Sequence, residues 1–173
     1  GLEIGTRRLI RKIHPTQGTV TINCTGETFT RAGLASVELN ADGDYWLLEK
    51  VTATRWELVD GWNTGENANG SWVRKASGVQ TCLSRQESNS DLSTPSGSVY
   101  RTGSNIWELP KIFISTDNLV FSGKQVASPG YAWISEGSSI PSTSQLTWSM
   151  FSSVSSPSNK PIASISATGR WYE

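Results

Sequence analysis

Short stretches in which apolar and polar residues alternate recur along this sequence, and turn residues separate them. Val37 and Leu39 alternate with polar neighbours, and near the C-terminus Ile165 and Ala167 alternate with serine and threonine. A period of two places every second side chain on the same face of a strand, whereas a helix needs apolar residues three or four apart. The sequence therefore predicts an all-β chain built from short antiparallel strands.

The composition agrees with this pattern and excludes several classes of protein. Charged residues make up only 17% of the chain, whereas eight Trp, four Tyr and four Phe are enough to fill a core. Lys and Arg number 15, as do Asp and Glu, so the formal net charge is zero. A nucleic-acid binder usually carries a basic surplus, so we expect no nucleic-acid partner. No apolar run approaches the ~18 residues of a membrane span, so we expect no membrane insertion.

Turn and loop signals predict three parts along the chain. Residues 1–60 hold several alternating stretches, and Asp42-Gly43 among them supplies the positive φ that tight hairpin turns require. They predict a small antiparallel β domain with an N-terminal lead-in. Residues 61–98 predict a linker, a β-hairpin and an extended crossing. Residues 99–173, with short strands and frequent turn signals, predict a C-terminal antiparallel β-sandwich.

The middle part begins with GWNTGENANG, residues 61–70, whose glycines and asparagines indicate a loop. Residues 71–75 and 79–83 flank a turn at Ala76-Ser77-Gly78 and predict the hairpin. Residues 84–98 are polar and carry no period, which indicates an extended crossing.

Cys24 and Cys82 lie far apart, and both end strand-like runs. We favour two buried thiols, and a single disulfide stays open as the alternative. His14 is the only histidine, so the His and Cys side chains make a poor zinc set, and no calcium-binding loop occurs. We therefore expect no metal and no cofactor. The start at Gly1, without Met, indicates a mature or excised part of a longer chain.

Two segments near the middle of the chain read NGSWVR, residues 69–74, and GVQTC, residues 78–82. They resemble a segment that the C-terminal region of bacteriophage tail fibres and tailspikes carries as NGS-aromatic-VR and DG-x-Q-x-C, with Ser77 in place of the usual Asp. Residues 165–172, ISATGRWY, resemble their A-x-GRW ending. Residues 36–60 resemble the small β domain that often precedes this unit.

Between these segments, Trp107, Val120-Phe121 and Trp133-Ile134-Ser135 stand where those fibres have the strands of a six-stranded sandwich similar to H-type lectins. The resemblance covers residues 18–173. It implies a homotrimer at the distal end of a tail fibre in the virion, assembled in the host cytoplasm, where cysteines stay reduced. It also implies that the chain recognises a bacterial surface glycan, such as lipopolysaccharide or capsule, or another host receptor.

The first candidate ligand-binding residues are Tyr131, Trp133 and Glu136. Because Ala132 and Ile134 fit a core face, Tyr131 and Trp133 are expected on the opposite face, where aromatic rings suit the apolar side of a sugar. Glu136 opens the polar loop 136–144 and offers an acceptor for sugar hydroxyls. The alternative is that both rings lie in the core or at a trimer interface.

A second set of candidates lies in the expected loop at 61–70. Trp62 offers a ring, and Asn63 and Asn67 offer amides that both donate and accept. The alternative is a hinge whose glycines and asparagines allow positive φ. Nearby, Trp72 and Arg74 share a strand face, and we expect a stack of guanidinium on ring between protomers.

The carboxylates give no reason to expect catalysis. A glycosidase needs two acids that face one cleft. Asp42 and Asp44 belong to a predicted hairpin turn, and Glu66, Glu87 and Asp91 sit in polar loops without a nearby aromatic floor. We therefore expect no catalytic residues, and the depolymerase activity of the resembling family usually resides in a separate, larger domain. Two alternatives to adhesion stay open, a structural module that trimerises and caps the fibre, and a fragment of a polysaccharide depolymerase.

Overall fold

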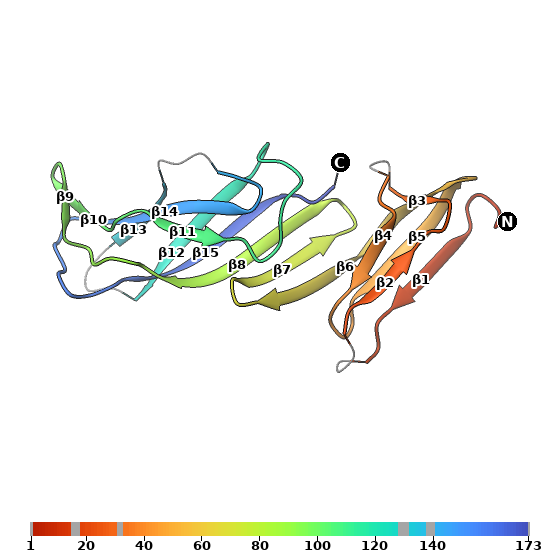
Figure 1. Cartoon of the computed structure of the whole chain (residues 1–173), viewed down its shortest axis with the longest axis horizontal. Helices are drawn as coiled ribbons and strands as arrows, with labels where there is room; N and C mark the ends of the chain where they lie inside the picture. Colours follow the sequence, from red (N-terminus) through yellow and green to blue (C-terminus); the bar gives the residue numbers. More distant parts are fainter. Residues whose placement is uncertain (1, 15–17, 31–32, 128–131, 138–140, 173) are drawn as a thin grey trace. The chain divides into compact units, whose positions relative to one another are not determined.

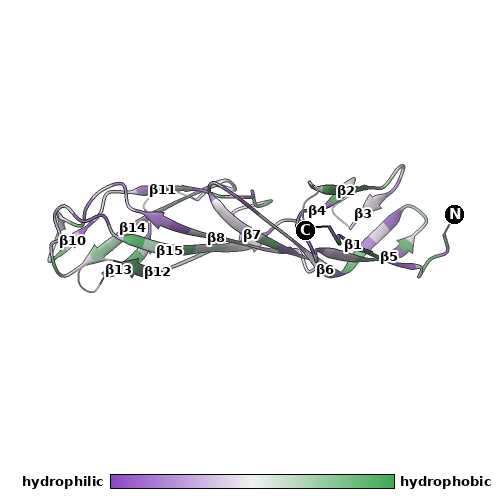
Figure 2. Ribbon diagram, turned by 90° about the horizontal axis from the view of Figure 1, so that it is seen from below, coloured by the Kyte–Doolittle hydropathy of each residue, from purple (hydrophilic) through white to green (hydrophobic). Residues whose placement is uncertain are grey.

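A computed structural model describes residues 2–14, 18–30, 33–127, 132–137 and 141–172 (Figure 1). These residues form strands and connections without any helix, so the predicted all-β class is confirmed. It follows that the described part holds no helix long and apolar enough to cross a membrane. Hydrophobic colour occurs in short segments of the ribbon and not in one long run (Figure 2). The strands are β1 (Arg7–Arg11), β2 (Val20–Asn23), β3 (Thr28–Phe29), β4 (Ser36–Leu39), β5 (Tyr45–Thr52), β6 (Arg55–Asn67), β7 (Gly70–Lys75), β8 (Val79–Glu87), β9 (Thr94–Ser96), β10 (Val99–Arg101), β11 (Asn105–Glu108), β12 (Val120–Ala127), β13 (Ala132–Glu136), β14 (Gln145–Ser152) and β15 (Ile162–Arg170).

The strands form three sheets. The largest has the order β1-β5-β6-β7-β8-β15-β12, with β3 parallel to β6. A second sheet has the order β11-β14-β10-β9, with β13 also on β14, and β2 pairs with β4. The chain divides into two compact units, and several strands contribute residues to both. The first unit comprises Gly1–Gly65, Trp72–Gln80 and Arg170–Glu173, and the second comprises Glu66–Ser71 and Thr81–Gly169. The three-part division predicted from the sequence stays a prediction.

The core of the first unit lies between the β2–β4 pair and the β1-β5-β6 part of the large sheet. Val37 and Leu39 of β4 are buried, as their alternation predicts, together with Trp46 and Leu48 of β5. The indole nitrogen of Trp46 donates to the carbonyl of Glu38 at 2.8 Å, so this large side chain is buried without losing its hydrogen bond.

The Asp42-Gly43 turn joins two sheets and not two paired strands. Gly43 has the expected positive φ of 87°, but β4 pairs with β2, whereas β5 pairs with β1 and β6. The prediction of a hairpin here is therefore wrong. The buried carboxylate of Asp44 holds the connection, because it accepts hydrogen bonds from the backbone of Asn40 and Ala41 and from Thr64.

The interpretation of residues 61–70 as a loop is wrong, because β6 continues to Asn67. Leu47 pairs with Asp60 and Leu48 with Leu58, which leaves Val59 as an extra residue, a β-bulge. Before the bulge Trp56 and Leu58 are buried, and after it Gly61 and Asn63 are buried. The bulge thus reverses which residues face the core, and it turns Trp62 outward. The glycines and asparagines of residues 61–67, which suggest a loop, belong to a strand with a bulge.

One other prediction in this region is confirmed and one holds only in part. The hairpin is present as β7 and β8 around the turn at residues 76–78. The expected crossing at 84–98 begins later than predicted, because β8 continues to Glu87, and it contains the short β9.

The core of the second unit lies between the large sheet and the β14 sheet. Leu146, Trp148 and Met150 of β14 are fully buried, and so are Ile165 and Ala167 of β15. Leu146, Trp148 and Met150 alternate with Thr147 and Ser149 in the sequence, and Ile165 and Ala167 alternate with serine and threonine, so the period of two accounts for both buried faces. Gly123 of β12 leaves room for the side chain of Ile134, because a Cβ there would lie 3.0 Å from its Cδ1. β12 and β15 therefore pack against β13 and β14 as two layers.

Cys24 and Cys82 form no disulfide in the structure, as the sequence predicts. Cys82 is fully buried in the second unit, but Cys24 of the first unit is only half-buried, so the prediction of two buried thiols holds for Cys82 alone. Burial raises the pKa of the Cys24 thiol, helped by the nearby charge of Glu27.

Gly61 of β6 has a backbone angle and surroundings that leave no room for a side chain. Its φ is 123°, and a Cβ would lie 2.1 Å from the backbone carbonyl oxygen of Tyr45. We expect Gly61→Ala to lower the free energy of unfolding by more than about 1 kcal/mol, measured by urea denaturation. Gly43 also has a positive φ but open space around it, so Gly43→Ala measures the cost of the backbone angle without a steric clash. Gly18 has neither a positive φ nor a close neighbour, so we expect Gly18→Ala to leave the free energy of unfolding unchanged. Equal stability of all three variants would contradict this explanation.

Candidate ligand-binding surfaces

Two of the carboxylates weighed for catalysis, Asp91 and Asp44, accept hydrogen bonds that serve the fold. Asp91 accepts hydrogen bonds from Ser93 at 2.6 Å and from the backbone of Ser158 at 3.0 Å, and these bonds lower the pKa of its carboxyl. Asp44 binds the connection described above. Among the residues that the structure describes, no three His, Cys, Asp or Glu side chains gather as a metal site would require.

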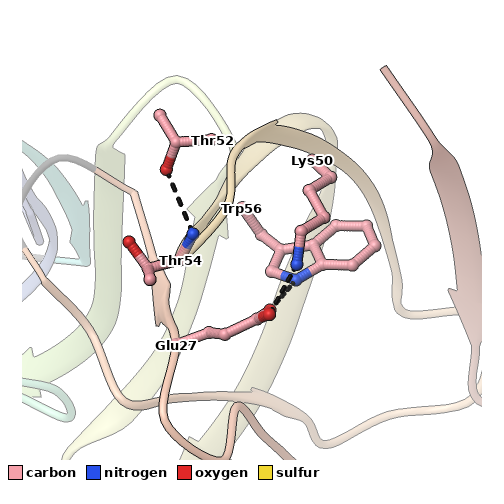
Figure 3. Close-up of polar contacts among 5 residues, drawn as sticks. All are labelled: Glu27, Lys50, Thr52, Thr54 and Trp56. Atoms are coloured by element: carbon pink, nitrogen blue, oxygen red, sulfur yellow. Dashed lines mark hydrogen bonds and ion pairs between the residues drawn. The ribbon is translucent and has the colours of Figure 1, made fainter. Parts of the chain in front are cut away.

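Glu27, Lys50 and Trp56 form a compact charged cluster in the first unit (Figure 3). The carboxylate of Glu27 accepts a hydrogen bond from Lys50 Nζ at 2.5 Å and another from Trp56 Nε1 at 2.5 Å. The Lys50 ammonium also lies 5.3 Å from the centre of the Trp56 ring, so the buried charge has both an anion and a π face. Both carboxylate oxygens are used within the cluster, which makes it a structural feature that ties the chain before β3 to β5 and β6.

The cluster makes stability depend on pH. The hydrogen bond from Lys50 lowers the pKa of Glu27 below its ordinary value of 4.5, and the hydrogen bond from Trp56 lowers it further. A carboxylate with a lowered pKa stabilises the fold above its ordinary pKa, and this contribution is lost as the pH falls through the lower, folded value. We expect Glu27→Gln to lower the melting temperature at pH 7, because Lys50 loses its anion, and to lower it less near pH 3. Glu66→Gln, at an exposed glutamate, is the control, and a deficit that does not change with pH contradicts this assignment.

Trp133 lies on the outward face of β13 in the second unit. Its side chain is 49% exposed, while Ala132 and Ile134 on either side are half-buried. Trp133 pairs directly with Phe151 of β14, and the two rings stack with centres 6.0 Å apart and planes 15° from parallel. Two neighbouring strands thus hold an aromatic pair, the Trp133–Phe151 platform, in which Trp133 is exposed and Phe151 is half-buried. Phe151 was not a candidate, because only the strand register shows that it lies beside Trp133.

The other residues predicted to act with Trp133 are not brought to the platform. Tyr131 lies outside the described residues. Glu136 pairs with Trp148 and shares the face of Ile134, so alternation places it on the opposite side of β13. Ser135 shares the face of Trp133 and is exposed, which makes its hydroxyl the nearer polar group on this strand.

Trp62 lies on the outward face of β6 in the first unit and is 43% exposed. Its ring packs edge-on against Tyr45, with ring centres 4.5 Å apart. Burial raises the pKa of Tyr45, and the hydrogen bond that its phenol donates to Asp60 raises it further. Two hollows adjoin the indole. The larger, of ≈ 540 Å³, reaches Val59, Asp60, Thr64, Val73 and Lys75, and the smaller, of ≈ 320 Å³, reaches Leu9, Arg11 and Tyr45.

The two asparagines predicted to accompany Trp62 bind backbone instead. Asn63 is buried and donates its amide to the carbonyl of Glu38 at 2.9 Å. Asn67, in the second unit, donates to the carbonyl of Pro110 at 2.9 Å and accepts from the backbone of Asn69. Asn63 therefore offers no group to a ligand at the surface, because the bulge at Val59 turns it inward.

Arg74 has a stacking partner from the C-terminal segment of the first unit. Its guanidinium lies 4.9 Å from the centre of the Trp171 ring, and its Nε donates to Gln80 at 2.6 Å. Trp72 is buried against Gly65, where a Cβ would lie 2.2 Å from the indole. Arg74 thus helps to fasten the C-terminal segment within one chain.

Comparisons of this chain with protein-family models, curated proteins and solved structures find no match. Function therefore has to be inferred from the residues and geometry of the chain itself. Two surfaces stand out within the described residues, the Trp133–Phe151 platform of the second unit and the hollowed face around Trp62 in the first.

Proposed function

We propose that this chain is the receptor-binding tip of a phage tail fibre or tailspike, which adheres without catalysis to a bacterial surface polysaccharide such as lipopolysaccharide or capsule. The segments at 69–74 and 165–172 that resemble such fibres support the proposal, and so does the all-β fold. The observation that carries it is the Trp133–Phe151 platform, a stacked aromatic pair on two paired strands whose Trp133 ring is exposed.

The platform suits a sugar for physical reasons. The C–H face of a pyranose packs on an aromatic ring, and its hydroxyls need polar groups close by. Ser135 supplies a hydroxyl on the same face, because its strand position alternates in phase with Trp133. Stacked rings on paired strands lose little side-chain entropy on binding, which favours affinity at a shallow site.

We propose further that the hollowed face of the first unit is where the subunits of a homotrimer meet. Leu9, Val59 and Trp62 are all exposed there, although each is large and apolar. Charged groups of both signs, among them Arg11, Asp60 and Lys75, border the hollows, so identical subunits can complement one another. Three platforms on one rigid tip raise the effective affinity of a weak sugar site by avidity.

Light scattering tests the trimer. We expect a mass of three chains of 18.8 kDa at micromolar concentration, and Leu9→Ser should shift the equilibrium toward the monomer. Val154→Ser, at an exposed apolar residue of the second unit, is the control. A monomeric wild type contradicts the trimer. If only the control variant dissociates, the subunit interface does not lie on the first unit.

The Trp133→Ala variant tests adhesion. Loss of an aromatic hot spot costs about 2 kcal/mol or more, so binding at each site should fall by at least about 30-fold, with a larger loss of adsorption to cells. The melting temperature should stay nearly unchanged, because half of the side chain is exposed. Val120→Ala on β12 is the matched exposed control. Binding is measured against purified lipopolysaccharide and capsule from a panel of Gram-negative strains.

The outcomes separate the rival functions. A trimer that binds no glycan in the panel supports the structural capping module, and release of oligosaccharides from the polysaccharides supports a depolymerase fragment. A folded Trp133→Ala variant that binds like the wild type contradicts the platform as the site.

A further inference from the structure

We propose that Arg101 extends the Trp133–Phe151 platform into a site for an acidic sugar, a saccharide that carries a carboxylate or a phosphate group. The inference rests on the proposed function and names the ligand class of that same site. Its starting point is the register of four strands in the second unit.

Arg101 lies in the same row as the two rings. In β10 and β14, Arg101 pairs directly with Phe151, and in β13 and β14, Phe151 pairs directly with Trp133. Residues directly opposite in antiparallel strands project from the same face of the sheet. Thr94 of β9 pairs with Arg101 and continues the row with a hydroxyl. The row therefore crosses four strands. It holds the Thr94 hydroxyl on β9, the Arg101 guanidinium on β10, and then the rings of Phe151 on β14 and Trp133 on β13.

The spacing of the row fits an oligosaccharide. Neighbouring strands lie about 4.8 Å apart, so Arg101 and Trp133 are separated by roughly 10 Å with Phe151 between them. A sugar ring stacked on the aromatic pair thus leaves its acidic substituent, or that of the next sugar, within reach of the long Arg101 side chain.

The charge of Arg101 is not balanced on this face. Arg101 is exposed, and within the described residues no carboxylate forms an ion pair with it. The acids on or beside these strands are used or turned away, and Asp91, just before β9, accepts from Ser93 and from the backbone of Ser158. Glu108 accepts from Gln145 at the other end of β14, and Glu136 lies on the opposite face of β13. A guanidinium binds a carboxylate or phosphate with two parallel hydrogen bonds, so this row selects an anion over a neutral sugar.

The test compares charged and neutral forms of one ligand. Oligogalacturonates and phosphorylated lipopolysaccharide core oligosaccharides serve as probes, each beside its carboxyl-reduced or dephosphorylated counterpart, with the trimeric full chain. We expect Arg101→Gln to weaken binding of the acidic form by about tenfold to a hundredfold, as a charge-assisted hydrogen bond does, and to leave the neutral form unaffected. Arg101→Lys should retain part of the binding, and binding to wild type should weaken with salt.

Arg85→Gln, at another exposed arginine of the second unit, is the matched control and should bind like the wild type. Equal binding of acidic and neutral forms, no binding of either, or full binding by Arg101→Gln overturns the inference. If Trp133→Ala loses binding while Arg101→Gln keeps it, the platform stands and only the acidic ligand is wrong. If neither variant alters binding, the proposed site falls as well. Loss of trimer in Arg101→Gln also overturns it, because the anion would then belong to a second copy of the chain.

Discussion

The pairing of β14 on both of its edges is the constraint on which the candidate site depends. Leu146, Trp148 and Met150 are fully buried. A shift of the strand register by one residue would expose all three side chains to solvent. Their burial therefore fixes the register, and the register places Phe151 on the outward face between its neighbours on β10 and β13. A well-packed inner face thus produces an ordered outer face, which is how a sheet presents a ligand site without a deep pocket.

The first unit uses a different device to expose an aromatic ring. The bulge at Val59 and the glycine at 61 reverse the phase of β6, so that Trp62 faces outward and Asn63 inward within one continuous strand. Bulges of this kind re-aim side chains at the cost of local pairing. Exposed apolar residues around Trp62 then suit a subunit contact, which is why our proposal puts self-association in this unit and ligand recognition in the second.

The alternation of apolar residues was sufficient to predict the class of fold and the buried faces of β4, β14 and β15, because burial on one face imposes a period of two. It failed where the period breaks. Residues 61–67 read as a loop because a bulged strand needs glycine, as loops do. The partner of Trp133 was equally out of reach, because Phe151 lies 18 positions away and only the register of β13 and β14 brings the two rings together.

The most direct test of the proposed site observes the indole N–H signals of the protein by NMR during titration with a lipopolysaccharide oligosaccharide. The chain has eight tryptophans, and the signals of Trp133, Trp62 and the buried Trp148 are assigned by substitution. The account predicts that the Trp133 signal shifts in proportion to occupancy, while those of Trp62 and Trp148 stay in place. A shift of the Trp62 signal with no change at Trp133 would contradict it and would place recognition in the first unit.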